Sequence, residues 1–257
     1  MCTASWIRDQ SGYQVLFNRD EKLTRKPALE PRLVVRNGTR FLAPVDGDFG
    51  GTWIGTNEFG VSVCLLNGAN LTGSKIDFAA PRCSRGLLLP DLLPLPSVAA
   101  ICDRIREADL SVFAPFTLAA LEPSHPAAIV EWDGSNRTFV FEAADRFMLT
   151  SSSFDPEGVR LKRLQEYSQV RDGHELFDFH RSHSPARSAY STCMHRADAK
   201  TVSFSWIQVS PQETDFFYRP GALCQKLPGV RLNLARCPSS GSSQQHPVRA
   251  GQVREAS

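Results

Sequence analysis

The chain lacks a pronounced excess of charge of either sign. Its 257 residues include 29 Lys and Arg against 27 Asp and Glu, which gives a formal net charge of +2 at pH 7. Binding to nucleic acid or to an acidic membrane surface depends on clustered positive charge, which this balance does not supply. The sequence therefore predicts no nucleic-acid partner and no membrane-surface partner.

Long apolar runs are also absent. Arg8 and Asp9 follow the N-terminus so closely that the apolar core of a secretory signal has no room. The most apolar stretch, "GLLLPDLLPLPSVAAI", is interrupted by three prolines and Asp91, and it falls short of the roughly 18 uninterrupted apolar residues that suggest a membrane helix. We expect a cytoplasmic protein without an integral membrane segment.

The sequence has no CxxC motif. Its seven cysteines are odd in number and scattered at positions 2, 64, 83, 102, 193, 224 and 237. This spacing indicates neither a disulfide framework nor a zinc site. A reducing compartment fits this pattern, and the sequence predicts no metal and no cofactor.

The apolar content, by contrast, is ample for folding. Hydrophobic residues make up 42% of the chain, enough to build one sizeable core. We expect a single domain over residues 1–236. The final stretch, residues 237–257, is rich in Ser, Gln, Gly and Arg and poor in apolar residues, so we expect a disordered tail.

Strand-like segments dominate both ends of the chain. Alternating apolar patterns predict hairpins over 2–18, 53–65 and 127–142, a short strand at 147–153, and a closing pair within 191–210 and 214–221. An amphipathic helix is expected over 98–110, capped by Ser97, and residues 156–181 are expected to be mainly helical. This order predicts an α+β fold with sheets covered by helices.

The first hairpin brings a charged cluster back to the N-terminus. Its turn, "RDQSG", places Cys2 opposite a residue between Asn18 and Glu21. Removal of Met1 would leave Cys2 with a thiol and an α-amine of pKa about 7.7 to 8.0, so that nucleophile and base share one residue. Arg19 would favour the thiolate and Asp20 would orient the amine. The alternative is a small strand residue beside a solvated loop.

Three motifs together resemble a known family. Met1-Cys2, "NRDE" at 18–21 and "GGTWIG" at 50–55 are similar to the NRDE family, also called the transport and Golgi organisation protein 2 family. The resemblance implies an N-terminal nucleophile hydrolase fold, a four-layer αββα sandwich with two antiparallel sheets between helical layers. Cysteine-type relatives, such as bile salt hydrolases and penicillin V acylases, cleave linear amides.

The same resemblance suggests site residues. It implies Cys2 as nucleophile, Arg19 as a neighbour of the thiol or of a substrate carboxylate, and Asp20 as the partner of the amine. Asn18 and Trp53 are candidate substrate contacts. The bile salt hydrolases supply an oxyanion donor from a mid-chain asparagine, whereas the corresponding stretch here is "TSSSF", so a hydroxyl within residues 150–153 or a backbone N–H is expected instead.

The expected function is a cysteine amidohydrolase or acyltransferase acting on a small linear amide or thioester. The alternative is a non-catalytic carrier of haem, acyl-CoA or lipid on the same scaffold. A thiol or histidine is a possible haem ligand, but the sequence contains no CxxCH motif.

Other histidines and cysteines were weighed as sites. His174, His180 and His183 lie near Asp178, but we expect caps at a helix end rather than metal ligands. Cys193 and His195 are expected to share one face of a strand, either as a Cys-His pair or as ordinary half-buried residues. Arg196 would point to the other face, where an anionic substrate is one possible partner. Core positions are expected for three other cysteines, Cys64, Cys102 and Cys224.

Overall fold

A computed structural model describes residues 1–68, 83–123 and 125–237 of the chain. The predicted tail lies outside the described residues from position 238 onward. The strands are β1 (Cys2–Asp9), β2 (Gly12–Lys22), β3 (Leu29–Arg36), β4 (Thr39–Val45), β5 (Ile54–Asn57), β6 (Ser62–Asn67), β7 (Phe116–Leu121), β8 (Ala127–Trp132), β9 (Arg137–Glu142), β10 (Arg146–Ser151), β11 (Ala199–Val209), β12 (Glu213–Pro220) and β13 (Val230–Ala235). The helices are α1 (Leu89–Leu92), α2 (Val98–Glu107), α3 (Pro156–Tyr167) and α4 (Gly173–Arg181), with one 3₁₀ turn, η1 (Arg85–Leu87).

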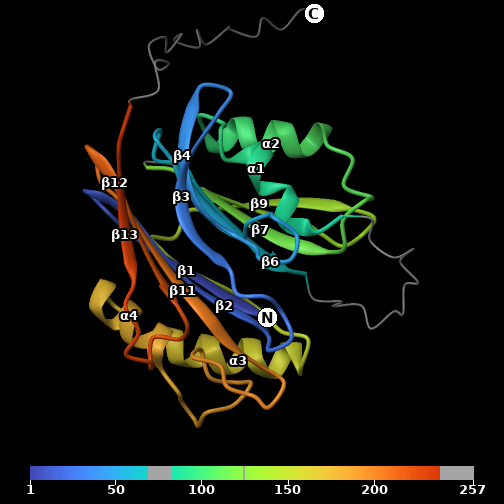
Figure 1. Cartoon of the computed structure of the whole chain (residues 1–257), viewed down its shortest axis with the longest axis vertical. Helices are drawn as coiled ribbons and strands as arrows, with labels where there is room; N and C mark the ends of the chain where they lie inside the picture. The colour runs from blue at the N-terminus through green and yellow to red at the C-terminus, as the bar shows by residue number, and fades with distance from the viewer. Residues whose placement is uncertain (69–82, 124, 238–257) are drawn as a thin grey trace, which may run out of the picture.

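Within the described residues, the strands form two antiparallel sheets. One has the order β10-β1-β2-β11-β12-β13, and the other runs β3 to β9 in sequence order. The sheets stack face to face, with α1 and α2 outside the second sheet and α3 and α4 outside the first (Figure 1). The predicted α+β class and four-layer αββα sandwich are thus confirmed. None of the helices in the described ranges is long and apolar enough to cross a membrane.

The layers follow from the alternation of side chains along each strand. In β1, Cys2, Ala4 and Trp6 enter the core between the two sheets, where burial of apolar surface stabilises the fold by about 25 cal/mol per Å². Thr3 and Ser5 point the other way and are also fully buried, beneath α3 and α4. A strand covered on both faces explains why β1 does not alternate between apolar and exposed polar residues.

Helix boundaries follow the capping pattern. Ser97 caps α2 by accepting a hydrogen bond from the Ala100 N–H at 3.1 Å, as the sequence predicted. Asp172 caps α4 by accepting from the N–H groups of His174 and Glu175, each at 2.9 Å. The stretch expected to be helical over 156–181 is therefore two helices, because Asp172 begins a new one.

The structure corrects one expectation and adds one hairpin. The closing strand β11 begins at Ala199, so Cys193 and His195 lie in the preceding loop and not on a strand. The hairpin of β3 and β4 was not predicted. In β3, the apolar residues Leu29, Leu33 and Val35 are exposed and the strand carries Pro31, so its pattern does not match a half-buried strand.

Candidate active site

Cys2 begins β1 between two neighbouring strands. It lies opposite Arg19 of β2 and opposite Ser151 of β10. The hairpin therefore returns the charged cluster to Cys2 within the range that the sequence predicted. Because directly opposite residues in a sheet share a face, the side chains of Arg19 and Ser151 flank that of Cys2.

The thiol of Cys2 is almost entirely enclosed, with 8% of the residue exposed. Burial raises its pKa above the usual value, and the nearby N-terminal ammonium of Met1 opposes this rise less strongly. The thiol is therefore protonated at neutral pH, and a nucleophilic role requires a base to remove its proton.

Asp20 lies on the opposite face of β2, beneath α3. Its carboxylate accepts hydrogen bonds from Thr201 Oγ1 at 2.7 Å and from Arg163 Nη2 at 3.4 Å, and it is fully buried. Its backbone pairs with the N-terminal residue: the Met1 amine donates to the Asp20 carbonyl at 3.1 Å, and the Asp20 N–H donates to the Met1 carbonyl at 3.0 Å. Burial raises the pKa of Asp20, and the charge of Arg163 opposes that rise.

Arg163 of α3 organises this buried face. Its guanidinium is fully buried and donates to several oxygen atoms besides that of Asp20. These are the Thr3 and Thr150 hydroxyls and the carbonyls of Ala189, Tyr190 and Ser191. One arginine therefore ties β1, β2, β10 and the loop before β11 together behind Cys2.

Arg19 lies on the inner face with Cys2. Its guanidinium pairs with the carboxylate of Asp46 and stacks on the ring of Trp53 at 4.2 Å. Asp46 is shared with Arg25, whose Nη2 lies 2.6 Å from the same oxygen. A buried arginine held on two sides in this way has a fixed position beneath the thiol.

The "GGTW" motif builds the wall beside Trp53. Gly50 has a φ of +73°, and a Cβ on Gly51 would collide with the backbone of Gly86. The Thr52 N–H donates to the Gly86 carbonyl at 2.9 Å. The sequence predicted both glycine roles, and together they bring η1 against the cavity.

A cavity of 500 Å³ opens beside the thiol. Arg19 and Trp53 line it, and so does Arg85 of η1. Arg85 makes no ion pair with any residue in the described ranges. By contrast, Arg19 pairs with Asp46 and Glu21, and Arg25 pairs with Asp46 and Asp48. The other lining residues are Cys2, Glu21, Arg25, Asp46, Phe49, Thr52, Leu65, Asn67, Cys83, Ser84, Gly86, Leu87 and Ala114.

A second, more apolar cavity of 570 Å³ adjoins the first at Asn67. Its walls include Phe116, Trp132, Phe147 and Leu149. Ser151 also lines it, and within the described part of the chain the Ser151 hydroxyl is buried without a hydrogen-bond partner. The polar cavity beside the thiol therefore adjoins a more apolar cavity.

Two of the predicted substrate contacts lie elsewhere. The Asn18 amide faces α4, where Nδ2 donates to the carbonyls of His180 and Thr192, each at 2.8 Å. Arg196 pairs with Asp198 at 2.9 Å and stacks on Phe154 at 4.9 Å. Neither residue lines the cavity beside Cys2.

The structure adds residues that the sequence did not suggest. Asp46, Arg85 and Arg163 are distant from Cys2 in the chain, and no local motif marks them. Arg163 was hidden in a helix with ordinary surface composition. A charged residue at a position expected to face the core was the only available signal.

The three histidines near Asp178 do not lie together. His174 is exposed and lies 3.6 Å from Asp178, whereas His180 is buried and faces Ser5 and Asn18. His183 lies beyond the end of α4, so it does not share a helical face with His180. His180 is therefore an interior residue and not a helix cap.

Comparison with known proteins agrees with the motifs and the fold. The family model described as "Transport and Golgi organisation 2" matches residues 1–210. No match was found among curated proteins.

Three solved structures share the architecture. An N-acylethanolamine-hydrolyzing acid amidase ortholog from Caenorhabditis elegans superposes with a TM-score of 0.58 at 15% identity, over 80% of this chain and 92% of that one. Penicillin V acylase from Agrobacterium tumefaciens superposes with a TM-score of 0.54 at 12% identity, over 90% of this chain and 86% of that one. A mutant conjugated bile acid hydrolase from Clostridium perfringens superposes with a TM-score of 0.54 at 14% identity, over 90% of this chain and 92% of that one. At these identities the likeness establishes the N-terminal nucleophile hydrolase fold.

Proposed function

The chain belongs to the transport and Golgi organisation 2 family, and on that basis we propose that it is an N-terminal cysteine amidohydrolase or acyltransferase. The proposal rests on one observation above all: Cys2, at the start of β1, lines a cavity and is held in the sheet opposite Arg19 and Ser151. A linear amide or thioester is the proposed substrate.

Removal of Met1 is the first step that the proposal requires. The α-amine then belongs to Cys2, and its ordinary pKa of about 7.7 to 8.0 leaves part of it unprotonated at neutral pH. The amine takes the thiol proton, so the raised pKa of the buried thiol is overcome by a base on the same residue. The two hydrogen bonds between Met1 and the backbone of Asp20 are lost with Met1. Pairing of Cys2 with Arg19 and Ser151 in the sheet keeps that end of the chain in place.

The thiolate then attacks the carbonyl carbon of the substrate. The carbon–oxygen double bond gives an oxyanion, for which the Ser151 hydroxyl and the Asn67 amide are candidate donors. Asn67 lines both cavities, and Ser151 lines the second cavity and lies opposite Cys2 in the sheet. Collapse breaks the carbon–nitrogen or carbon–sulfur bond, and the ammonium of Cys2 returns its proton to the leaving group. Water or an acceptor amine then attacks the acyl thioester and regenerates the thiol.

The two cavities suggest the substrate class. The apolar cavity suits a hydrocarbon or aromatic acyl group. Arg85 offers the first cavity a positive charge that forms no ion pair in the described residues and that interacts with Glu21 at longer range. We therefore propose an acyl amide or thioester with an apolar acyl group and an anionic leaving portion. The three structural neighbours are named as an N-acylethanolamine-hydrolyzing amidase, a penicillin V acylase and a conjugated bile acid hydrolase.

Intact-mass measurement tests this function. The full-length protein is incubated with N-acyl amino acids and acyl thioesters of increasing acyl length, and the acyl adduct is located by peptide mapping. We expect an adduct on Cys2 that forms and decays with product release. Cys2→Ala should remove it, whereas Cys83→Ser, which changes a second thiol lining the same cavity, should keep it.

Two outcomes would contradict the proposal. An adduct on Cys83 or Cys193 in place of Cys2 would mean that the nucleophile is misassigned. Tight binding of the same ligands by both wild type and Cys2→Ala, with no product from either, would favour the carrier on this scaffold.

A further inference from the structure

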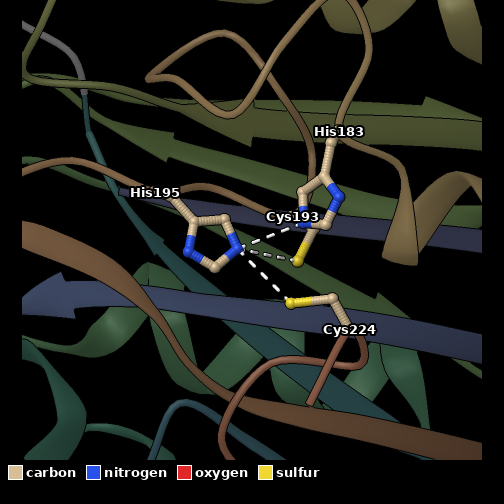
Figure 2. A group of neighbouring side chains, drawn as sticks. All are labelled: His183, Cys193, His195 and Cys224. Atoms are coloured by element: carbon tan, nitrogen blue, oxygen red, sulfur yellow. Dashed lines mark hydrogen bonds between the residues drawn. The ribbon is translucent and has the colours of Figure 1, made fainter.

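Four side chains with metal-binding atoms converge away from Cys2. His183 follows α4, Cys193 and His195 lie in the loop before β11, and Cys224 lies in the loop after β12. Their ligand atoms all lie within 4.8 Å of one another. Figure 2 shows the two rings and the two sulfur atoms pointing into one shared space.

One ring nitrogen in this cluster has more neighbours within hydrogen-bonding distance than it can bond at the same time. His195 Nε2 lies 3.2 Å from His183 Nε2, 3.5 Å from Cys193 Sγ and 3.4 Å from Cys224 Sγ (Figure 2). A ring nitrogen carries either one hydrogen or one lone pair, so it can satisfy one of these three neighbours at a time. A cation at the centre would engage all four atoms at once.

The distances from His195 Nε2 to the other three ligand atoms are close to those of a tetrahedral site. With Zn–N bonds of about 2.0 to 2.1 Å and Zn–S bonds of about 2.3 Å, neighbouring ligand atoms are separated by about 3.3 to 3.8 Å. The two distances from His195 Nε2 to sulfur, 3.5 and 3.4 Å, lie within that range, and its distance of 3.2 Å to His183 Nε2 lies just below it. Two thiols and two imidazoles are also a donor set that tetrahedral Zn²⁺ commonly takes.

We propose that His183, Cys193, His195 and Cys224 form a Cys₂His₂ site for one divalent transition-metal ion, with Zn²⁺ as the ion it best fits. Binding releases the two thiol protons to solvent and leaves both imidazoles neutral. Four protein ligands complete the coordination, so the ion is structural and not a centre of catalysis.

The site would secure the loop behind Asp20. Between the two ligands of that loop, the Met194 N–H donates to Thr201 Oγ1 at 2.9 Å, and Thr201 Oγ1 donates to the Asp20 carboxylate at 2.7 Å. An ion held by His195 and Cys224 would tie this loop to the segment after β12. The absence of a CxxC motif follows because the ligands come from three separate segments.

Metal analysis of the full-length protein tests the proposal. The protein is produced with zinc in the medium and purified through a tag without histidine, and bound metal is measured per chain. We expect one equivalent of zinc. Replacement by Co²⁺ should give the visible bands of a tetrahedral ion together with thiolate charge-transfer absorption in the near ultraviolet.

Matched variants locate the ion. Cys224→Ser and His183→Gln should each weaken Co²⁺ binding at least about tenfold, as loss of one ligand predicts. Cys237→Ser alters a half-buried thiol beside Glu58, and Cys2→Ala alters the proposed nucleophile. Both should bind Co²⁺ like the wild type.

Several results would overturn the proposal. Wild-type protein without zinc and without the cobalt bands would show that the cluster takes no ion. A disulfide between Cys193 and Cys224 in protein kept reduced until analysis would show redox pairing instead. If the ligand variants fail to fold, the cobalt spectra of the wild type, Cys2→Ala and Cys237→Ser still test the proposal. Absorption from two thiolates that is retained in both of these variants would come from the cluster.

Discussion

Cys2 and Arg19 face each other across β1 and β2, and both side chains lie on the surface between the two sheets. The next residue, Asp20, points to the opposite side and is buried under α3. The side chains of the "NRDE" motif therefore contact two different layers of the fold, because side chains along a strand alternate between its faces. Arg19 and Glu21 face the cavity, whereas Asn18 and Asp20 anchor the helical layer.

Processing of the N-terminus is the first prediction. Because residue 2 is small, we expect the mature protein to begin at Cys2, and intact-mass measurement of the purified protein checks this. A variant with a short uncleaved extension before Cys2 should lose acylation, since its amine no longer belongs to the nucleophile. Normal acylation of the extended protein would rule out the amine as the base.

Asp20→Asn should slow acylation of Cys2 by about 10²- to 10⁴-fold, the range typical of lost acid–base assistance, because it removes the negative charge that interacts with the N-terminal amine. The same substitution should also destabilise the fold. The substitution leaves the buried charge of Arg163 without its carboxylate, and breaking such a pair costs about 3 to 5 kcal/mol. Thermal unfolding and the acylation rate should be measured side by side.

Arg163→Gln provides the matched variant for Asp20→Asn. It disturbs the same buried pair but keeps the carboxylate of Asp20. We expect a comparable fall in melting temperature with a smaller loss of acylation rate. Equal rate losses in the two variants would make Asp20 a structural residue whose effect on Cys2 comes through folding alone.

Arg85→Gln should raise KM for a substrate with an anionic leaving portion by about 10- to 100-fold while changing kcat little, as expected when one charge-assisted hydrogen bond is lost. A neutral substrate of the same acyl group should show no change. Arg25→Gln is the control, because Arg25 lines the same cavity but is already paired with Asp46. An equal rise in KM for both substrates would indicate a general effect on the cavity.

Much of the fold could be predicted because the signals are local. The hairpin of β1 and β2 follows from two apolar segments around one turn, and the Ser97 cap and the "GGTW" glycines each act on their immediate neighbours. The position of Cys2 opposite residues 18–21 depended only on that hairpin. Local patterns therefore predicted the α+β class and the candidate nucleophile, whereas the four-layer sandwich was implied by the family resemblance.

The rest of the site depends on contacts between distant segments. Arg163 reaches Asp20 from a helix far along the chain, and Cys224 meets His195 only because the loops after β12 and before β11 adjoin. Asn18 lies on the face away from Cys2 for a similar reason: the direction of its side chain depends on which face each layer covers. The spacing of residues along the sequence does not predict these contacts between distant segments.

His180 shows how one such encounter affects stability. Its Nε2 lies 2.7 Å from Ser5 Oγ, and its Nδ1 lies 3.1 Å from Asn18 Oδ1. Because the Asn18 Nδ2 already donates to two carbonyls, its Oδ1 accepts from Nδ1–H, and Nε2 accepts from the Ser5 hydroxyl. The neutral ring is thus satisfied, while burial and the nearby charge of Arg163 lower the pKa of His180 to about 3.

The folded protein should therefore lose stability as pH falls. An unfolded histidine titrates near pKa 6.5, so between pH 6.5 and 3 the unfolded chain binds a proton that the folded chain does not, and the free energy of unfolding rises with pH. The contribution of neutral His180 to the free energy of unfolding is fully present above pH 6.5, and it declines by roughly 4 to 5 kcal/mol as the pH falls to 3. Urea unfolding across this range should show a flatter pH dependence for His180→Gln than for the wild type. His174→Gln, at an exposed position, should follow the wild type, and equal slopes in all three proteins would contradict a neutral buried His180.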